Sequence, residues 1–148
     1  MNINLNEYLK FIKNLDYALV KIDVPYMTKD FPNSYPIGKD LDIIIKKEHF
    51  NNIITITNNF IKKFNYSNIF NIKIILLKNN VKFRFIENNK LHYQFDITID
   101  ENNLLLNKQI INNYYLLSLE NEIKIREDEI KKNPNKLHHK EWLLTNKI

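Results

Sequence analysis

The residues with the clearest chemical potential are two aspartates spaced two positions apart, Asp40 and Asp42. The hydrophobic residues around them predict a buried strand over 41–45. Because alternate residues of a strand share one face, both carboxylates point the same way, while Leu41 and Ile43 point into the core. Oxygen ligands held together in this way suit Mg²⁺ or Mn²⁺, which would relieve their repulsion. Two solvated aspartates at the start of a strand are the alternative interpretation.

A third aspartate, Asp96, lies in the alternating segment 91–99. The residues expected to face the core there are all hydrophobic: Leu91, Tyr93, Phe95, Ile97 and Ile99. Asp96 therefore projects from the opposite face in mid-strand, where a surface strand more often carries Thr, Lys or Gln. It either completes a carboxylate triad with Asp40 and Asp42 or is a charge on an exposed sheet face that pairs with a lysine.

Two basic residues, Lys82 and Arg84, are expected on the same open face of the sheet. The segment 81–87 predicts a strand that pairs with 91–99 across a three-residue loop, 88–90. A two-residue loop would set phenylalanines against polar residues, which the hydrophobic pattern rejects. The favoured register pairs Lys82 with Asp96, Arg84 with Gln94, Phe83 with Phe95 and Phe85 with Tyr93. Lys82 and Arg84 then either bind phosphate oxygens or neutralise the aspartate.

The histidines give weaker signals. His92 shares a face with Asp96, where it either reaches a substrate or is solvated. His138 and His139 lie in a lysine-rich tail near Trp142. This tail is either a phosphate-binding or partner-binding element, or a helix that docks Trp142 onto the domain. Adjacent histidines do not have the i, i+4 spacing of a helical zinc site.

The elements that must position these residues follow from hydrophobic periodicity and turn residues. In chain order they are a helix over 4–15, a strand over 17–22, an irregular loop over 23–38, a strand over 41–45, a helix over 47–64, and strands over 70–77, 81–87 and 91–99. From about 104 the pattern predicts a helix through 130, and a polar tail follows. We therefore expect an α+β fold in which helices pack on a mixed sheet of about five strands. One domain is expected over 1–148, with a core at about 5–100 and a helical C-terminal part at about 104–148.

The composition excludes several function classes. The 148 residues include no cysteine, which excludes disulfide scaffolds and thiolate metal sites. A single glycine cannot build a glycine-rich phosphate loop of the P-loop or dinucleotide-binding type. The net charge of +5 rests on scattered lysines with only two arginines, so nucleic-acid binding is possible but not favoured. With no membrane-span or signal-peptide pattern, we expect a cytoplasmic protein.

The arrangement Gly38-Lys39-Asp40-Leu41-Asp42, followed by a lone Asp96 in a later hydrophobic strand, resembles the polymerase-β-like nucleotidyltransferase superfamily. The similarity covers roughly residues 5–100, and its specific part is 38–43 and 95–97. The resemblance implies a nucleotidyltransferase-like fold in which Asp40 and Asp42 hold two Mg²⁺ ions. It implies that Asp96 joins one ion and helps to activate the attacking hydroxyl.

The resemblance further implies an enzyme that transfers a nucleoside monophosphate from an NTP to an unidentified hydroxyl or phosphate acceptor. The layout is most similar to divergent members associated with sugar or polysaccharide modification. The family's Gly-Ser or Gly-Gly before the paired aspartates is missing here, and Ser34 is the candidate replacement. Lys39, Lys82 and Arg84 are the other candidate nucleotide-binding residues. We expect the 23–38 loop to lie beside the carboxylates and to order when nucleotide binds.

Two further function classes stay open. The first is a catalytically inactive relative of the same fold that binds nucleotide or protein. The second is a basic nucleic-acid-binding domain without chemistry. Only the enzyme and its inactive relative require the carboxylates of Asp40, Asp42 and Asp96 to cluster, roughly 4–6 Å apart for ligands of one ion. The acceptor, the preferred base and the oligomeric state cannot be read from the sequence.

Overall fold

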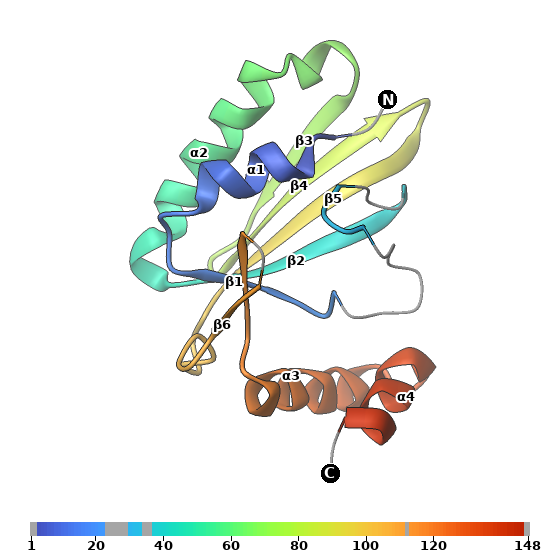
Figure 1. Cartoon of the computed structure of the whole chain (residues 1–148). Coiled ribbons are helices and arrows are strands. Elements are labelled where there is room, and N and C mark those ends of the chain that lie inside the picture. Colours follow the sequence, from blue (N-terminus) through green and yellow to red (C-terminus); the bar gives the residue numbers. More distant parts are fainter. Residues whose placement is uncertain (1–2, 23–29, 34–36, 112, 147–148) are drawn as a thin grey trace.

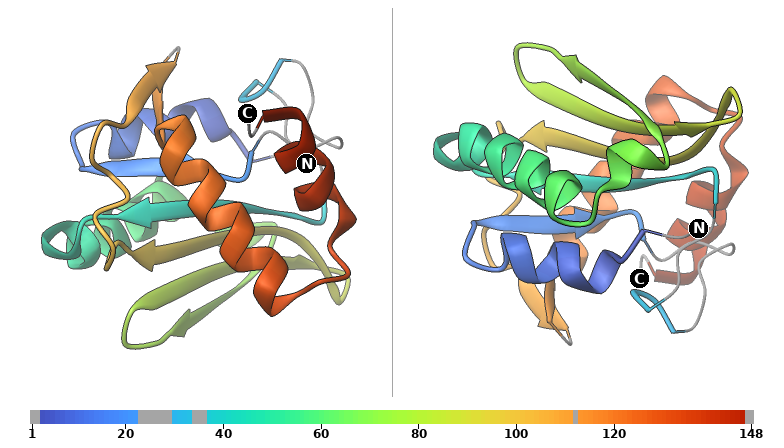
Figure 2. Two further views of the ribbon diagram at one scale, coloured as in Figure 1. Left: turned by 90° about the horizontal axis from the view of Figure 1, so that it is seen from below. Right: turned by 90° about the horizontal axis from the view of Figure 1, so that it is seen from above.

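The computed structural model describes residues 3–22, 30–33, 37–111 and 113–146. Over this part of the chain it has three layers, with one mixed sheet between two pairs of helices (Figure 1). The helices of the first pair are α1 (Leu5–Ile12) and α2 (Phe50–Lys63). Those of the second pair are α3 (Leu119–Lys132) and α4 (Leu137–Asn146). The pairs lie on opposite faces of the sheet, as the views from below and above show (Figure 2).

Seven strands form the sheet within the described residues. They are β1 (Tyr17–Val20), β2 (Lys39–Ile45), β3 (Asn71–Leu76), β4 (Asn80–Glu87), β5 (Lys90–Ile99), β6 (Gln109–Ile111) and β7 (Tyr114–Leu116). Their order across the sheet is β3-β4-β5-β2-β1-β7-β6. The β2–β5 and β1–β7 pairs are parallel, and the other pairs are antiparallel. The expected α+β class with a mixed sheet is therefore confirmed.

The main core lies between the sheet and the first helix pair. Helix α1 buries residues at i, i+3, i+4 and i+7, namely Leu5, Tyr8, Leu9 and Ile12. The side chain of Asn4 caps this helix by accepting a hydrogen bond from the backbone N–H of Glu7. Inside the core, the hydroxyls of Tyr8 and Thr57 share a hydrogen bond of 2.8 Å, so neither buried group is left unsatisfied.

The second helix pair covers the opposite face of the sheet with far less hydrophobic material. A small cluster of Ala18, Val20 and Leu117 lies under it, with Ile125 of α3 packed against the cluster. The buried side chains of α3 and α4 are instead polar, Arg126 and His139. Polar and ionic contacts therefore contribute much of the attachment of this layer, and the face that carries the aspartates is the polar side of the molecule.

The C-terminal third differs from the sequence-based expectation. The described residues 104–111 and 113–118 are not helical, because Asn103 and Asn107 adopt the left-handed φ values of 55° and 60°, which an α-helix does not allow. The segment forms β6 and β7 instead, and Leu116 pairs with Leu19 to cover the edge of β1. The sheet thus has seven strands rather than about five, and the expected polar tail contains α4.

The register between β4 and β5 is the expected one, with Lys82 opposite Asp96 and Arg84 opposite Gln94. The path to that register is different from the three-residue loop that the sequence suggests. Only Asn88 and Asn89 form the turn, since Glu87 already pairs with Lys90. The pairing shifts by one residue between Phe85 and Ile86, leaving His92 as the extra residue of a β-bulge in β5. A short turn and a bulge together give the same pairing as a longer loop.

Asn89 provides a direct test of this turn. It is exposed and has φ 62°, a value that Asn and Gly tolerate and β-branched residues do not. We expect Asn89→Val to lower the free energy of unfolding by about 1–2 kcal/mol, whereas Asn89→Gly should change it little. Urea unfolding of both variants measures the difference, and equal stabilities would contradict the left-handed turn.

Candidate metal centre

Three carboxylates converge where β2 and β5 lie side by side. The parallel pairing places Asp42 directly beside Asp96, and Asp40 lies two residues earlier on the same face of β2. One oxygen from each of Asp40, Asp42 and Asp96 lies within 4.8 Å of the other two. Leu41 and Ile43 point to the opposite face and are buried in the core. The expected clustering of the three carboxylates is confirmed.

Each of the two inner carboxylates has a lysine beside it. Asp42 Oδ2 lies 3.5 Å from Lys21 Nζ, and Asp96 Oδ2 lies 3.9 Å from Lys82 Nζ. Asp96 Oδ1 also accepts a hydrogen bond of 2.6 Å from the side-chain amide of Asn80. Asn80 in turn accepts from Lys82, so these groups form one network along the edge of the cluster. Asp40 is the exposed member of the triad.

The electrostatics of the cluster oppose full ionisation. Burial raises the pKa of Asp42 to about 6 against an ordinary value of 3.8; Lys21 lowers it, and Asp96 and Asp40 add to the rise. Burial and Asp96 also raise the pKa of Asp40. Burial alone would lower the pKa of Lys21, but Asp42 and Glu129 hold it above its ordinary value. The lysines therefore offset only part of the desolvation and repulsion of the carboxylates.

The donor set fits a hard divalent cation. Three carboxylates within reach of a shared ion, without any sulfur ligand, are typical of Mg²⁺ or Mn²⁺ sites. The excess negative charge is what such an ion would neutralise. Asp40, Asp42 and Asp96 are thus the residues that could hold the metal.

The other sequence-predicted residues have different positions relative to this cluster. Lys82 lies beside Asp96 as expected. Arg84 is one row away, opposite Gln94, and its buried Nε has no hydrogen-bond partner among the described residues. Lys39 lines the cavity next to the carboxylates. Ser34 lies outside the described residues.

Most of the loop over 23–38 also lies outside the described residues, so its expected place beside the cluster stays a prediction. The described part ends at Gly38, whose φ of 85° is a left-handed value that glycine adopts without strain. Its N–H donates to the carbonyl of His92 at 2.6 Å. The ring of His92 lies against Phe70, with 6.0 Å between ring centroids.

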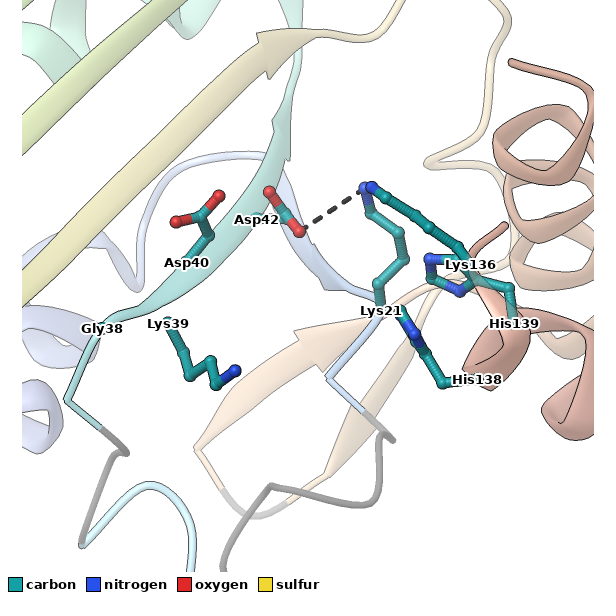
Figure 3. Close-up of a pocket in the computed structure, with 8 residues that line it drawn as sticks. All are labelled: Lys21, Gly38, Lys39, Asp40, Asp42, Lys136, His138 and His139. Carbon is teal, nitrogen blue, oxygen red and sulfur yellow. Dashed lines mark ion pairs between the residues drawn. The ribbon is translucent and has the colours of Figure 1, made fainter. Parts of the chain in front are cut away.

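The structure adds Lys21 to the site and places the tail histidines beside the carboxylates, which sequence reasoning did not do. A cavity of about 210 Å³ opens beside Asp40 and Asp42, and its other side carries Lys21, Lys136, His138 and His139 (Figure 3). Lys21 follows β1, and the other three residues come from the start of α4 or just before it. The sequence indicates a possible phosphate-binding role for the tail histidines, but no hydrophobic pattern in the sequence places α4 beside β2. Only the three-dimensional path of α3 does so.

Helix α4 is held in place through the buried Arg126 of α3. Its guanidinium lies 4.3 Å from the centre of the Trp142 ring, and its Nη1 lies 3.5 Å from His139 Nδ1. Burial, with His138 and Arg126, lowers the pKa of His139 to about 4, so this ring is neutral at pH 7. Trp142 therefore does dock the tail, as one of the two interpretations expects, and the docked helix also carries both histidines into the cavity wall.

The raised pKa of Asp42 predicts how stability depends on pH without metal. Because the folded state binds this proton more tightly than the unfolded state, ionising Asp42 costs stability as the pH rises from about 4 to about 6. We expect Asp42→Asn to raise the free energy of unfolding by about 1–3 kcal/mol at pH 7.5 and to change it little at pH 4. Urea unfolding in a chelator measures this; Glu120→Gln, at an exposed carboxylate of α3, is the control. An equal effect of Asp42→Asn at both pH values would contradict the electrostatic account.

Over the described residues, none of the helices has the length and apolar character that crossing a membrane requires. No protein-family model matches the chain, and no curated protein matches it significantly. A solved structure, JHP933 from Helicobacter pylori, is similar with 12% sequence identity and a TM-score of 0.51. The similarity covers 82% of this chain and 52% of that one, so this chain spans about half the length of JHP933. At this identity the similarity shows a related fold alone.

Proposed function

We propose that this chain is a Mg²⁺-dependent or Mn²⁺-dependent nucleotidyltransferase with a nucleotidyltransferase-like fold. It would transfer a nucleoside monophosphate from an NTP to a hydroxyl or phosphate acceptor. The observation that carries the proposal is the convergence of Asp40, Asp42 and Asp96 from two neighbouring parallel strands. Their order and spacing along the chain also resemble the polymerase-β-like superfamily, and an open cavity adjoins them.

In this proposal Asp40 and Asp42 would hold the metal with Asp96 as a further ligand, and bound divalent ions would supply charge neutralisation for the nucleotide phosphates. The acceptor oxygen bonds to the α-phosphorus, and the bond from that phosphorus to pyrophosphate breaks. Asp96 orients the acceptor and takes its proton. The hydrogen bond from Asn80 and the charge of Lys82 fix the orientation of the Asp96 carboxylate.

Positive charge around the cluster has a binding role in the same reaction. Lys82, Arg84 and Lys39 are the candidates for contact with phosphate oxygens. The buried, unpartnered Nε of Arg84 is a donor that such a contact could satisfy. A phosphate site built from these side chains would replace the missing Gly-Ser element, alone or with Ser34.

A second candidate function is a catalytically inactive binding module of the same fold. The ion pairs of Lys21 with Asp42 and Lys82 with Asp96 favour it, since they neutralise part of the cluster without metal. In such a module the carboxylates would bind Lys21 and Lys82 across neighbouring strands of the sheet rather than an ion. The two functions differ in their response to Mg²⁺.

Thermal unfolding with Mg²⁺ separates the two functions. If the cluster binds Mg²⁺, a concentration of ten times Kd should raise the Tm of the wild type by roughly 3–6 °C. The shift should be much smaller for Asp42→Asn, and Glu120→Gln should respond like the wild type. Equal shifts in the wild type and Asp42→Asn would favour the inactive module.

Transfer of an α-phosphate label from each of the four NTPs to small-molecule acceptors tests the chemistry. We expect Asp42→Asn to lower the transfer rate at least about a hundredfold, because it removes a charge that the ions require. Asp96→Asn should lower kcat by roughly 10²–10⁴-fold, as loss of a general base does, and should weaken Mg²⁺ binding less than Asp42→Asn does. Unchanged transfer in Asp96→Asn would contradict the role of this residue as proton acceptor.

A further inference from the structure

The cavity beside the carboxylates has a basic wall that the proposed reaction leaves without a role. Lys21 and Lys136 both extend from this wall toward the side where Asp42 lies (Figure 3). The space between the walls is about 210 Å³, the room of roughly seven water molecules. It can therefore hold a small charged group between the carboxylates and the lysines.

The backbone of Lys21 is held in position by a hydrogen bond to helix α3. Its φ of 56° is a left-handed value that a lysine adopts at a cost. Its backbone N–H donates to Glu122 Oε1 at 2.8 Å, and the same oxygen accepts from Nε of the fully buried Arg126 at 3.1 Å. Helix α3 thus fixes the backbone just after β1, and with it the position of the Lys21 Cα from which the side chain extends.

The pairing of Lys21 with Asp42 is loose by comparison. The distance of 3.5 Å exceeds the 2.7–2.9 Å of a strong charge-assisted hydrogen bond. Asp42 is also one of the three carboxylates that could bind a cation. A divalent ion that occupied Asp42 would compete directly with the Lys21 ammonium.

The charge of the cluster changes sign in that exchange. The three carboxylates carry one charge more than Lys21 and Lys82, the two ammonium groups beside them. One divalent cation makes the sum positive, and a second makes it strongly so. The carboxylate of Glu129, on the side of the basic wall, already pairs with Lys136 at 2.5 Å. A displaced Lys21 ammonium beside the positive cluster therefore favours a further anion, and the cavity between the two walls has room for it.

We propose that Lys21 is an exchangeable counter-ion, which pairs with Asp42 in the metal-free protein and with a phosphate group of the substrate once a divalent cation takes Asp42. His138 of α4 and Lys136 just before it complete the phosphate site, with Lys136 shared between the phosphate and its present partner Glu129. This inference rests on the proposed function and adds to it a phosphate subsite from the C-terminal helices. The phosphate belongs either to the nucleotide or to a phosphorylated acceptor, and the two can be told apart with model anions.

Isothermal titration with Mg²⁺ alone, and then with pyrophosphate or glycerol phosphate at saturating Mg²⁺, tests the subsite. The variants are Lys21→Met and Lys136→Met, which keep most of the side-chain stem. Lys124→Met, at an exposed lysine of α3, is the matched control. We expect Lys21→Met to bind Mg²⁺ as tightly as the wild type or more tightly, because a competing cation is gone. The same variant should bind the phosphate probe at least roughly tenfold more weakly.

The outcomes separate the subsite from the metal centre. Weaker pyrophosphate binding in Lys21→Met and Lys136→Met assigns the subsite to the nucleotide, and weaker glycerol phosphate binding assigns it to the acceptor. Wild-type Mg²⁺ and phosphate affinities in both variants would overturn the subsite and leave the metal centre intact. A wild type that binds no Mg²⁺ would overturn the proposed function itself. Because the Lys136 side chain is exposed at the surface end of the wall, Lys136→Met should fold normally. Phosphate binding by this variant therefore tests the subsite even if Lys21→Met disturbs folding.

Discussion

The parallel pairing of β2 with β5 is the constraint on which the rest of the site depends. It sets Asp42 beside Asp96 in the same row of the sheet, and the next row sets Asp40 beside Gln94. Parallel strands need a long connection, and here that connection contains α2, β3 and β4. The chain thereby brings back Lys82 and Asn80 on β4, next to Asp96. One pairing thus positions both the carboxylates and the groups that partly neutralise them.

The two faces of the sheet are stabilised in different ways. The face toward α1 and α2 is a packed aromatic and aliphatic core, in which Tyr8 stacks on Phe95 at 4.4 Å between centroids. The opposite face is attached largely by charges, with Glu122 joining the Lys21 backbone to Arg126. A buried guanidinium left without its carboxylate costs several kcal/mol, roughly 3–5. Electrostatic attachment of this second layer is consistent with a polar site between it and the sheet.

The parts of the fold that could be predicted from sequence are those governed by local periodicity. The strand patterns predicted at 41–45 and 91–99 correctly placed Asp40, Asp42 and Asp96 on one face, and the phenylalanine pattern correctly set the β4–β5 register. The segment 104–118 was mispredicted because its Asn103 and Asn107 leave the helical region and its strands are specified by the open edge of β1. Lys21 and the α4 wall were missed since their proximity to Asp42 depends on tertiary packing. The position of Ser34 relative to the site stays a prediction.

The origin of the carboxylates in two separate parts of the chain has a consequence for folding. The β3-β4-β5 meander has local connections, whereas the contacts of β2 with β5 join distant segments and must overcome a larger loop-closure entropy. Asp96 therefore belongs to a unit that can assemble without Asp40 and Asp42. The repulsion between Asp96 and the Asp40–Asp42 pair arises only when the two parts of the chain dock, so it opposes the β2–β5 contact rather than the formation of the meander. A cation held by all three residues recognises only the docked chain, so its binding would stabilise the native state by an amount that rises with the logarithm of the cation concentration above Kd.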